Sequence, residues 1–229
     1  MTLPVPASPG PRPANRQLTA FVWALLVVGL IAVIAAGVRE IWISSERQEV
    51  RSLPIYGQIP DFRLIERDGQ PRTLADCRGE IWFAAFFFSS CPGPCPVLSS
   101  RLAELAQAVG RTKGKVRVVS ITVDPAVDTP ERLRAYAQKY GAGKNWWFLT
   151  GPLPEIYRIA REGFKLAVEE NPPETVAQNG KMLHSTKIAM VDGQGRVRGY
   201  YNGTDADLLA RVLPDLGDLM RESREVPSK

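Results

Sequence analysis

The sequence predicts an α/β domain with a central mixed β-sheet, preceded by one N-terminal transmembrane helix. Three observations support this fold class. Residues 20–38 form an almost wholly apolar run near the N-terminus. Further along, the apolar runs Ile81–Phe88 and Val116–Val123 have the length of buried strands, and a helical pattern follows each of them. The chain then ends with a hairpin pattern and an amphipathic helix, so strands and helices alternate over most of the domain.

The apolar run 20–38 predicts a membrane anchor. No charged side chain lies within it, and a spanning helix needs roughly 20 apolar residues. Residues 1–19 contain Arg12 and Arg16 but no acidic residue, and arginine beside a transmembrane helix favours the cytoplasmic side. We therefore expect a cytoplasmic tail at residues 1–19 and the rest of the chain on the opposite side of the membrane.

A cleaved signal peptide is the alternative for this run, because the small residues Ala35 and Ala36 lie near its end. The run is longer than the roughly 7–15 apolar residues of a signal peptide, which favours a retained anchor. The preceding tail is too short and too poor in arginine for a mitochondrial transit peptide. We therefore predict a single-pass protein of the bacterial inner membrane whose folded domain lies in the periplasm. Thiol pairs tend to be oxidised there unless a reductant or a metal protects them.

The remaining chain divides into three segments. Residues 39–58 are expected to form a stalk, because charges of both signs follow the anchor there. Residues 59–222 carry all the strand and helix patterns described below and form the predicted domain. Residues 223–229 are expected to be a C-terminal tail.

The first half of the domain contains the two central strands. The Asp68-Gly69 pair predicts a hairpin near its start. The run Ile81–Phe88 is apolar at every position, as expected of a strand buried on both faces, so Phe86–Phe88 belong to the predicted core. After the next two cysteines, a helical stripe of apolar residues ends at Gly110. Val116–Val123 reads as a second buried strand.

A second helix follows the second strand. Thr129 is the expected N-cap, Pro130 suits the first helical position, and the pattern ends near Tyr140. A short strand at Trp146–Leu149 and a short helix at Leu153–Glu162 come next.

The second half of the domain ends with a hairpin and a helix. The strand patterns Lys187–Val191 and Arg196–Tyr201 flank a glycine-containing turn. The last helix covers Asp205–Arg221, and Pro214 is expected to kink or split it. Glu169–Met182 reads as a long loop. The order of these elements is that of a thioredoxin-like α/β sandwich.

Composition excludes several classes of protein. The chain has 29 Lys and Arg against 24 Asp and Glu, and its basic residues form no stripe, so we expect no nucleic-acid partner. The 3 cysteines are too few for a disulfide framework. The single histidine limits the number of residues that could bind a metal ion.

Cys91 and Cys95 are the principal candidates for chemistry. They lie between a predicted strand and a predicted helix, and the N-terminus of a helix lowers the pKa of a nearby thiol. Two sulfurs at this spacing can form a disulfide, attack one, or bind one soft metal ion. The spacing is Cys-x-x-x-Cys rather than the Cys-x-x-Cys usual for disulfide exchange in this fold, which favours metal binding. Cys77 lies in an upstream turn and reads as a small buried apolar residue.

His184 is the candidate third ligand. It shortly precedes the strand Lys187–Val191, where a thioredoxin-like domain places the loop that faces the active-site cysteines. Two thiolates and one imidazole form a soft site that favours Cu(I), with zinc as the main competitor. Structural zinc needs a fourth protein ligand, and the sequence has no second histidine.

Asp124 and Asp128 allow two interpretations. Asp124 ends a predicted strand and Asp128 lies just before a helix, where a carboxylate stabilises the helix N-terminus. Alternatively, this loop lies near the cysteines, at the same edge of the sheet, and tunes the site or contacts a partner.

The chain resembles the SCO/SenC/PrrC copper chaperones. The resemblance extends from about Ile59 to Leu216 and rests on these motifs: Cys91-Pro-Gly-Pro-Cys95-Pro96, Val123-Asp124-Pro125-x-x-Asp128-Thr129, and His184-Ser185 followed by Asp192-x-x-Gly195. It implies a membrane-anchored metallochaperone rather than an enzyme, which delivers copper to the CuA centre of cytochrome c oxidase. By this resemblance Cys91, Cys95 and His184 bind the copper, as Cu(I) or Cu(II). Gly93 departs from the pattern, because many members carry an aspartate there.

Two other functions use the same sulfurs. A thiol–disulfide oxidoreductase would reduce the cysteines of an oxidase subunit or of another periplasmic protein through Cys91 and Cys95, and would not need His184. A peroxidase would need a sulfur activated by a nearby cation, and no arginine lies within the cysteine motif itself.

Overall fold

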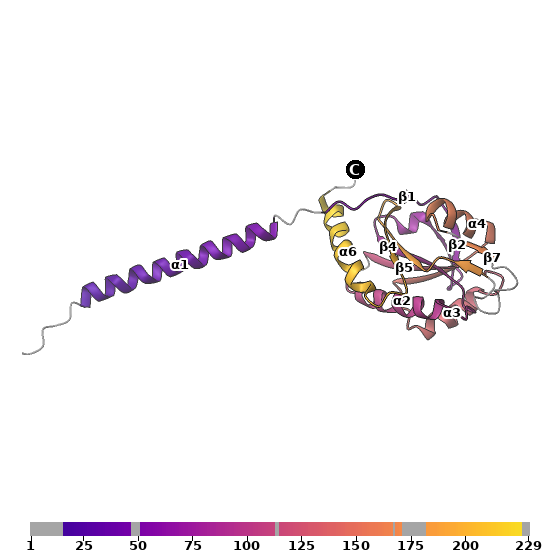
Figure 1. Cartoon of the computed structure of the whole chain (residues 1–229), viewed down its shortest axis with the longest axis horizontal. Helices are drawn as coiled ribbons and strands as arrows, with labels where there is room; N and C mark the ends of the chain where they lie inside the picture. The colour runs from indigo at the N-terminus through magenta and orange to yellow at the C-terminus, as the bar shows by residue number, and fades with distance from the viewer. Residues whose placement is uncertain (1–15, 47–50, 113–114, 167, 171–181, 226–229) are drawn as a thin grey trace, which may run out of the picture. The chain divides into compact units, whose positions relative to one another are not determined.

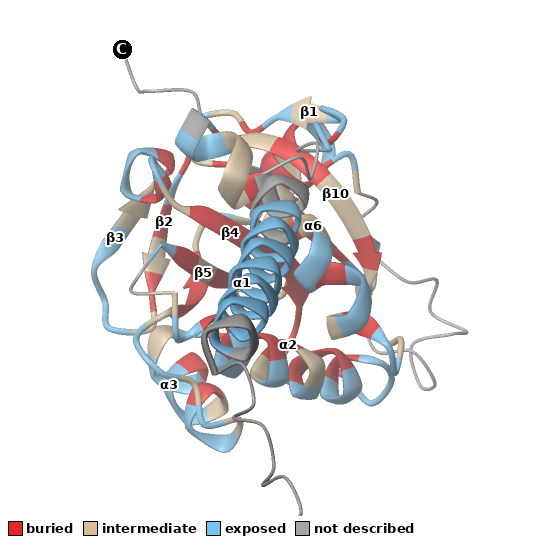
Figure 2. Cartoon of the chain, turned by 90° about the vertical axis from the view of Figure 1, so that its left-hand side faces the viewer, coloured by how far each residue is buried: buried red, intermediate tan, exposed pale blue. Residues whose placement is uncertain are grey.

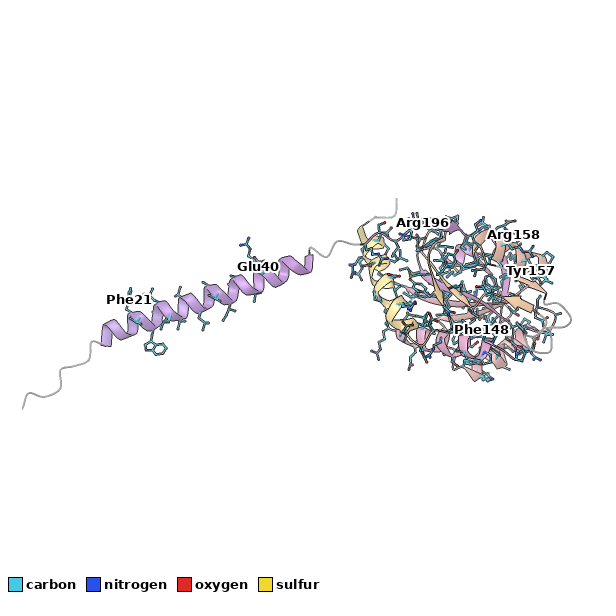
Figure 3. All side chains as sticks on the ribbon, viewed as in Figure 1. Phe21, Glu40, Phe148, Tyr157, Arg158 and Arg196 are labelled. Carbon is cyan, nitrogen blue, oxygen red and sulfur yellow. The ribbon has the colours of Figure 1, made fainter. Side chains whose placement is uncertain are left out.

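The computed structural model describes residues 16–46, 51–112, 115–166, 168–170 and 182–225. The chain divides into two compact units, Met1–Glu49 and Val50–Lys229. The first unit contains helix α1 (Arg16–Glu46), whose segment Ala20–Glu40 is long and apolar enough to cross a membrane. Figure 3 shows apolar side chains projecting from α1, among them the labelled Phe21. Phe21 is 63% exposed. This helix agrees with the predicted anchor, and it continues through the first part of the expected stalk.

The second unit is built on one mixed sheet. Within the described residues its strand order is β1-β10-β9-β4-β5-β6-β2-β3. The strands are β1 (Gly57–Gln58), β2 (Arg63–Glu66), β3 (Pro71–Thr73), β4 (Ile81–Phe87), β5 (Val116–Thr122), β6 (Trp146–Thr150), β9 (Lys187–Val191) and β10 (Arg196–Asn202). Strands β4, β5 and β6 are parallel, while β9 runs antiparallel to β4. The predicted mixed sheet is therefore confirmed.

Strand β4 lies in the centre of the sheet because both of its faces are apolar. All seven of its residues are buried. Alternate side chains point to opposite faces of a strand, and the contacts of β4 follow this rule. Trp82 and Phe86 pack edge-on against Phe164, whereas Phe87 stacks on Tyr136. Two different layers of structure therefore cover the two faces of β4.

The helices form these two layers. Helices α2 (Cys95–Val109), α3 (Pro130–Lys139) and α6 (Leu208–Glu225) pack on one face, while α4 (Leu153–Arg158) and the π-helix η2 (Ile159–Gly163) pack on the other (Figure 1). The hydroxyls of Ser99 in α2 and Tyr136 in α3 hydrogen-bond at 2.8 Å. Figure 2 shows β4 buried along its length, whereas α2 and α3 alternate between buried and exposed residues. This α/β sandwich is the predicted thioredoxin-like fold.

Several local predictions are confirmed. The hydroxyl of Thr129 caps α3 by accepting a hydrogen bond from the Arg132 amide at 3.4 Å. Gly69 turns the chain between β2 and β3 with a φ of +86°, a conformation that glycine adopts without steric cost. Pro214 does not split the last helix, because α6 runs continuously from Leu208 to Glu225.

The compact domain begins earlier than the expected boundary at Ile59. Strand β1 pairs with β10, and Leu53 is buried in the core. Arg198, whose side chain is 1% exposed, donates hydrogen bonds to the Leu53 carbonyl at 2.7 Å and to the carboxylate of Glu222. A two-residue strand has too short a pattern to recognise in sequence, so tertiary contacts alone reveal this boundary.

The prediction of a loop at Glu169–Met182 is wrong at both ends of this segment, where the chain forms strands. Val168–Glu170 forms β7 and Met182–His184 forms β8, and the two strands pair antiparallel, with Val168 opposite His184. Residues 171–181 lie outside the described residues. Strands of three residues give no usable periodicity, so the sequence did not predict this hairpin.

Candidate metal centre

Cys91 and Cys95 lie together just beyond the carboxyl end of β4. Cys91 sits in a turn, and its amide donates to the Phe88 carbonyl at 3.3 Å. Cys95 is the first residue of α2, and Pro94 is the N-cap before it. The two residues are 8% and 0% exposed, and neither forms a disulfide in the structure. The strand ends here because the proline-rich motif cannot continue a β-ladder, and prolines suit the first turn of a helix.

The pKa of the Cys95 thiol is raised, contrary to the expected effect of the helix N-terminus. Its hydrogen bond with the side chain of Cys91 is the main cause, and burial is the second. The negative charge of Asp128 acts in the same direction. Sharing a hydrogen with its neighbour and lying out of water both favour the neutral thiol. The surroundings of Cys95 therefore stabilise its protonated form.

The backbone of His184 lies at the same end of the sheet as the cysteines. Strand β9 begins three residues after His184, and Ile188 of β9 pairs with Ala85 near the end of β4. Since β9 runs antiparallel to β4, the start of β9 lies beside the point where β4 leads into Cys91. The side chain of His184 lies outside the described part of the structure.

Gly203 brings the segment after His184 against helix α2. The Gly203 amide donates to the Thr186 carbonyl at 2.9 Å. A Cβ on Gly203 would lie 2.2 Å from the Leu98 side chain and 2.7 Å from the same carbonyl. Leu98 is in the first turn of α2, three residues after Cys95. Gly203 thus contacts both the chain at Thr186 and the first turn of α2.

Cys77 is remote from this site. It ends the short helix η1 (Leu74–Cys77), which precedes β4, while Cys91 follows β4. Seven strand residues separate the two ends by roughly 20 Å. Cys77 is 2% exposed, and burial raises the pKa of its thiol to about 12. Its predicted role as a small buried apolar residue is confirmed. Among the side chains that the structure describes, no three or more His, Cys, Asp or Glu gather at one point.

Asp128 lies beside the cysteine loop and does not cap α3. Its carboxylate is fully buried. It accepts hydrogen bonds from the Ser89 amide at 3.0 Å, from the Ser89 hydroxyl, and from the Thr122 hydroxyl at 2.5 Å. The interpretation of Asp128 as a helix cap is therefore wrong. Strand β5 ends at Thr122, two residues before the predicted end at Asp124, whose amide donates to the Thr122 hydroxyl at 3.1 Å. Ser89 was not predicted, because only the fold brings positions 89 and 128 together.

Arg132 also reaches this loop. Its Nε donates to the Ser89 hydroxyl at 2.7 Å, and its side chain is 49% exposed. However, the hydrogen bond with Cys91 and burial raise the pKa of Cys95, and the charge of Asp128 adds to this effect. A peroxidase needs an activated sulfur with a lowered pKa, so the site does not support this function through Cys95.

Most of the folded domain matches a known protein family. The family model described as SCO1/SenC matches residues 56–216. The chain belongs to the SCO1/SenC family. It is 31% identical over 165 residues to a SCO1 protein homolog of Bacillus subtilis, covering 71% of this chain and 83% of that protein. It is also 31% identical over 176 residues to a putative copper-binding protein of Stutzerimonas stutzeri, covering 76% and 83%.

Solved SCO1/SenC structures share the fold. A family lipoprotein from Bacillus anthracis is 30% identical, with a TM-score of 0.66 over 73% of this chain and 97% of that one. BsSco, described as having a disulfide switch and as a member of the Sco family of cytochrome c oxidase assembly proteins, is 27% identical. Its TM-score is 0.64 over 75% and 98% of the two chains. The SCO1/SenC fold of this chain thus agrees with the thioredoxin-like architecture expected from its sequence.

Proposed function

We propose that this SCO1/SenC protein is a membrane-anchored copper chaperone of the bacterial inner membrane. It binds one copper ion, mainly as Cu(I), through Cys91, Cys95 and His184 in the periplasm. It then passes the ion to the CuA-bearing subunit of cytochrome c oxidase. Copper is the cargo of this protein rather than a resident cofactor.

The pair of thiols just beyond the end of β4 carries this proposal. Cys91 and Cys95 form no disulfide in the structure, hydrogen-bond to each other and are nearly excluded from water. Two such sulfurs select a soft ion, and Cu(I) is the soft ion that two thiolates and one imidazole suit best. The backbone of His184 lies at the same end of the sheet. Transfer by ligand exchange suits a three-coordinate site, because an incoming thiolate can replace the ligands one at a time.

The relatives support copper as the cargo. One similar protein is named as copper-binding, and another is described as a member of a family of cytochrome c oxidase assembly proteins. The candidate membrane span Ala20–Glu40 supports anchoring, and the arginines before it support export of the domain.

Copper titration of the full-length protein in detergent tests the site. The reduced protein competes for Cu(I) with a chromophoric chelator, and we expect one ion per chain. Cys91→Ser and Cys95→Ser should abolish tight binding, and His184→Ala should weaken it. Cys77→Ala is the matched control, because Cys77 is buried at the other end of β4, and it should bind as the wild type does. Equal binding by the wild type, Cys91→Ser and His184→Ala would refute the proposed site.

Delivery needs a second experiment. In cells that lack this chain, the CuA-bearing subunit should be poor in copper. Wild-type protein should restore its copper, whereas Cys91→Ser should not. Full copper loading of the subunit without this chain would contradict the proposed delivery.

A thiol–disulfide reductase is the second candidate function. The hydrogen-bonded dithiol of Cys91 and Cys95 favours it, because two adjacent reduced sulfurs can donate two electrons to a partner disulfide and form their own. Cys95→Ser should then trap a mixed disulfide with the partner, and His184→Ala should retain full activity in cells. Loss of function in His184→Ala alone would favour the chaperone instead.

A further inference from the structure

The carboxylate of Asp128 joins three separate segments of the domain. Its Oδ2 accepts the Ser89 amide at 3.0 Å and the Thr122 hydroxyl at 2.5 Å. Its Oδ1 accepts the Ser89 hydroxyl and lies 3.7 Å from Nε of Arg132. Ser89 follows β4, Thr122 ends β5, and Arg132 belongs to α3. The four groups form a single network around one buried charge.

Burying the carboxylate of Asp128 has a cost in free energy, so its place in the core needs an explanation. A buried carboxylate loses its hydration and is tolerated only when hydrogen bonds replace the water. Asp128 is 0% exposed, and Ser89 and Thr122 donate hydrogen bonds to its carboxylate. Its helix already has an N-cap in Thr129, so capping does not explain why a charge is buried there.

The position of Ser89 suggests what the network does. Ser89 precedes Cys91 by two residues, in a segment without regular structure that connects β4 to α2. The far end of this segment is held by α2, because the Leu98 amide donates to the Pro94 carbonyl at 3.0 Å. Its near end is held by Asp128 through Ser89. The separation of the two sulfurs thus depends on one fixed point in α2 and on another at Asp128.

We propose that Asp128 is the positioning residue of the cysteine loop, and that it acts through Ser89 to hold Cys91 where both sulfurs bind one copper ion. This inference rests on the proposed copper site. Asp128 is not a ligand in it, since its carboxylate oxygens are occupied by Ser89 and Thr122. Groups that orient metal ligands in this way usually contribute about 10–100-fold to metal affinity.

The test compares the full-length wild type with Asp128→Asn, Ser89→Ala and Ser89→Thr in detergent. Cu(I) affinity is measured by chelator competition, and the thiolate-to-Cu(II) absorption band reports the geometry of the bound ion. Asp128→Asn and Ser89→Ala should bind copper at least about tenfold more weakly and should shift this band. Ser89→Thr keeps a hydroxyl for Asp128 and should restore both properties.

Ser120→Ala is the matched control for a general loss of stability. Ser120 is a buried serine of β5, and its hydroxyl accepts a hydrogen bond from the Trp146 indole at 2.9 Å. This variant should be destabilised to a similar degree and yet bind copper as the wild type does. Equal loss of affinity in Ser120→Ala and Ser89→Ala would overturn the positioning role.

A measurement without copper separates this inference from the proposed function. The dithiol–disulfide equilibrium of Cys91 and Cys95 is measured against dithiothreitol in the metal-free protein. Asp128→Asn should shift this equilibrium several-fold toward the disulfide, because the network holds the loop in its dithiol geometry. A wild type that binds no copper would refute the proposed function alone. Variants with wild-type affinity, absorption band and disulfide equilibrium would refute the role of Asp128.

Discussion

Gly203 lies directly against Leu98, and its lack of a side chain allows the end of β10 to contact the first turn of α2. A Cβ at Gly203 would approach the Leu98 side chain to 2.2 Å and the Thr186 carbonyl to 2.7 Å. Both distances are far below those of ordinary packing. This close approach links the segment after His184 to the helix that begins with Cys95.

Gly203→Ala should therefore lower the free energy of unfolding by about 1–3 kcal/mol, the usual cost of overpacking a core. It should also weaken copper binding, because the chain near His184 must move away from α2. Chemical denaturation and Cu(I) competition measure the two effects. Gly217→Ala is the control, since its Cβ would meet only Arg221, at 3.9 Å. A Gly203→Ala protein as stable as Gly217→Ala would contradict the predicted contact.

Gly93 has room for a larger side chain such as aspartate. A Cβ there would meet only the Cys91 sulfur, at 3.9 Å, which is an ordinary contact. Gly93→Asp should change the stability by less than about 0.5 kcal/mol, as exposed substitutions usually do. A carboxylate near the sulfurs favours the harder Cu(II) over Cu(I), so the reduction potential of bound copper should fall. Gly93→Asn controls for size, and an equal potential in both variants would exclude an effect of charge.

Cys77 should resist modification in the folded protein. It is 2% exposed, and burial raises the pKa of its thiol to about 12. Alkylation followed by mass spectrometry should label Cys77 only after denaturation. Native labelling of Cys77 at the rate of the unfolded chain would show that the core opens near η1.

Cys77 should also make the stability depend on alkaline pH. Its pKa in the folded protein, about 12, exceeds the ordinary value of 9.0. Unfolding therefore releases a proton when the pH lies between these values, so the stabilising contribution of the neutral thiol is complete below pH 9 and is lost as the pH rises toward 12. The free energy of unfolding of Cys77→Ala, measured by denaturation at each pH, should fall less steeply than that of the wild type between pH 9 and pH 12. If the free energies of unfolding of the two proteins depended on pH in the same way, the raised pKa would be contradicted.

The orientation in the membrane is open to a direct test. Alkaline phosphatase, which is active only after export, should be active when fused after Glu46 and inactive when fused before Ala20. Arg12→Glu combined with Arg16→Glu should reduce the active fraction, because it removes the positive charges that favour the cytoplasmic side. Recovery of a mature protein that begins near Ala36 would instead show a cleaved signal peptide.

Much of the fold was predictable because its signals are local. The uninterrupted apolar run of β4 predicted a central buried strand, and Thr129-Pro130 predicted the start of α3. The spacing of Cys91 and Cys95 predicted paired sulfurs at a strand-to-helix turn, and both thiols lie there. Each of these features depends on residues that are neighbours in the chain.

Other features depend on contacts between distant residues, which only the tertiary structure decides. Asp128 looked like a helix cap by its position, yet its carboxylate binds Ser89, 39 residues earlier. The pKa of Cys95 was expected to fall at a helix N-terminus and is raised, because the Cys91 side chain and burial outweigh the helix. The sequence by itself determined the order of the long strands and helices and the candidate ligands Cys91, Cys95 and His184. Packing determined which groups surround the two sulfurs, because hydrogen bonds and desolvation act through space rather than along the chain.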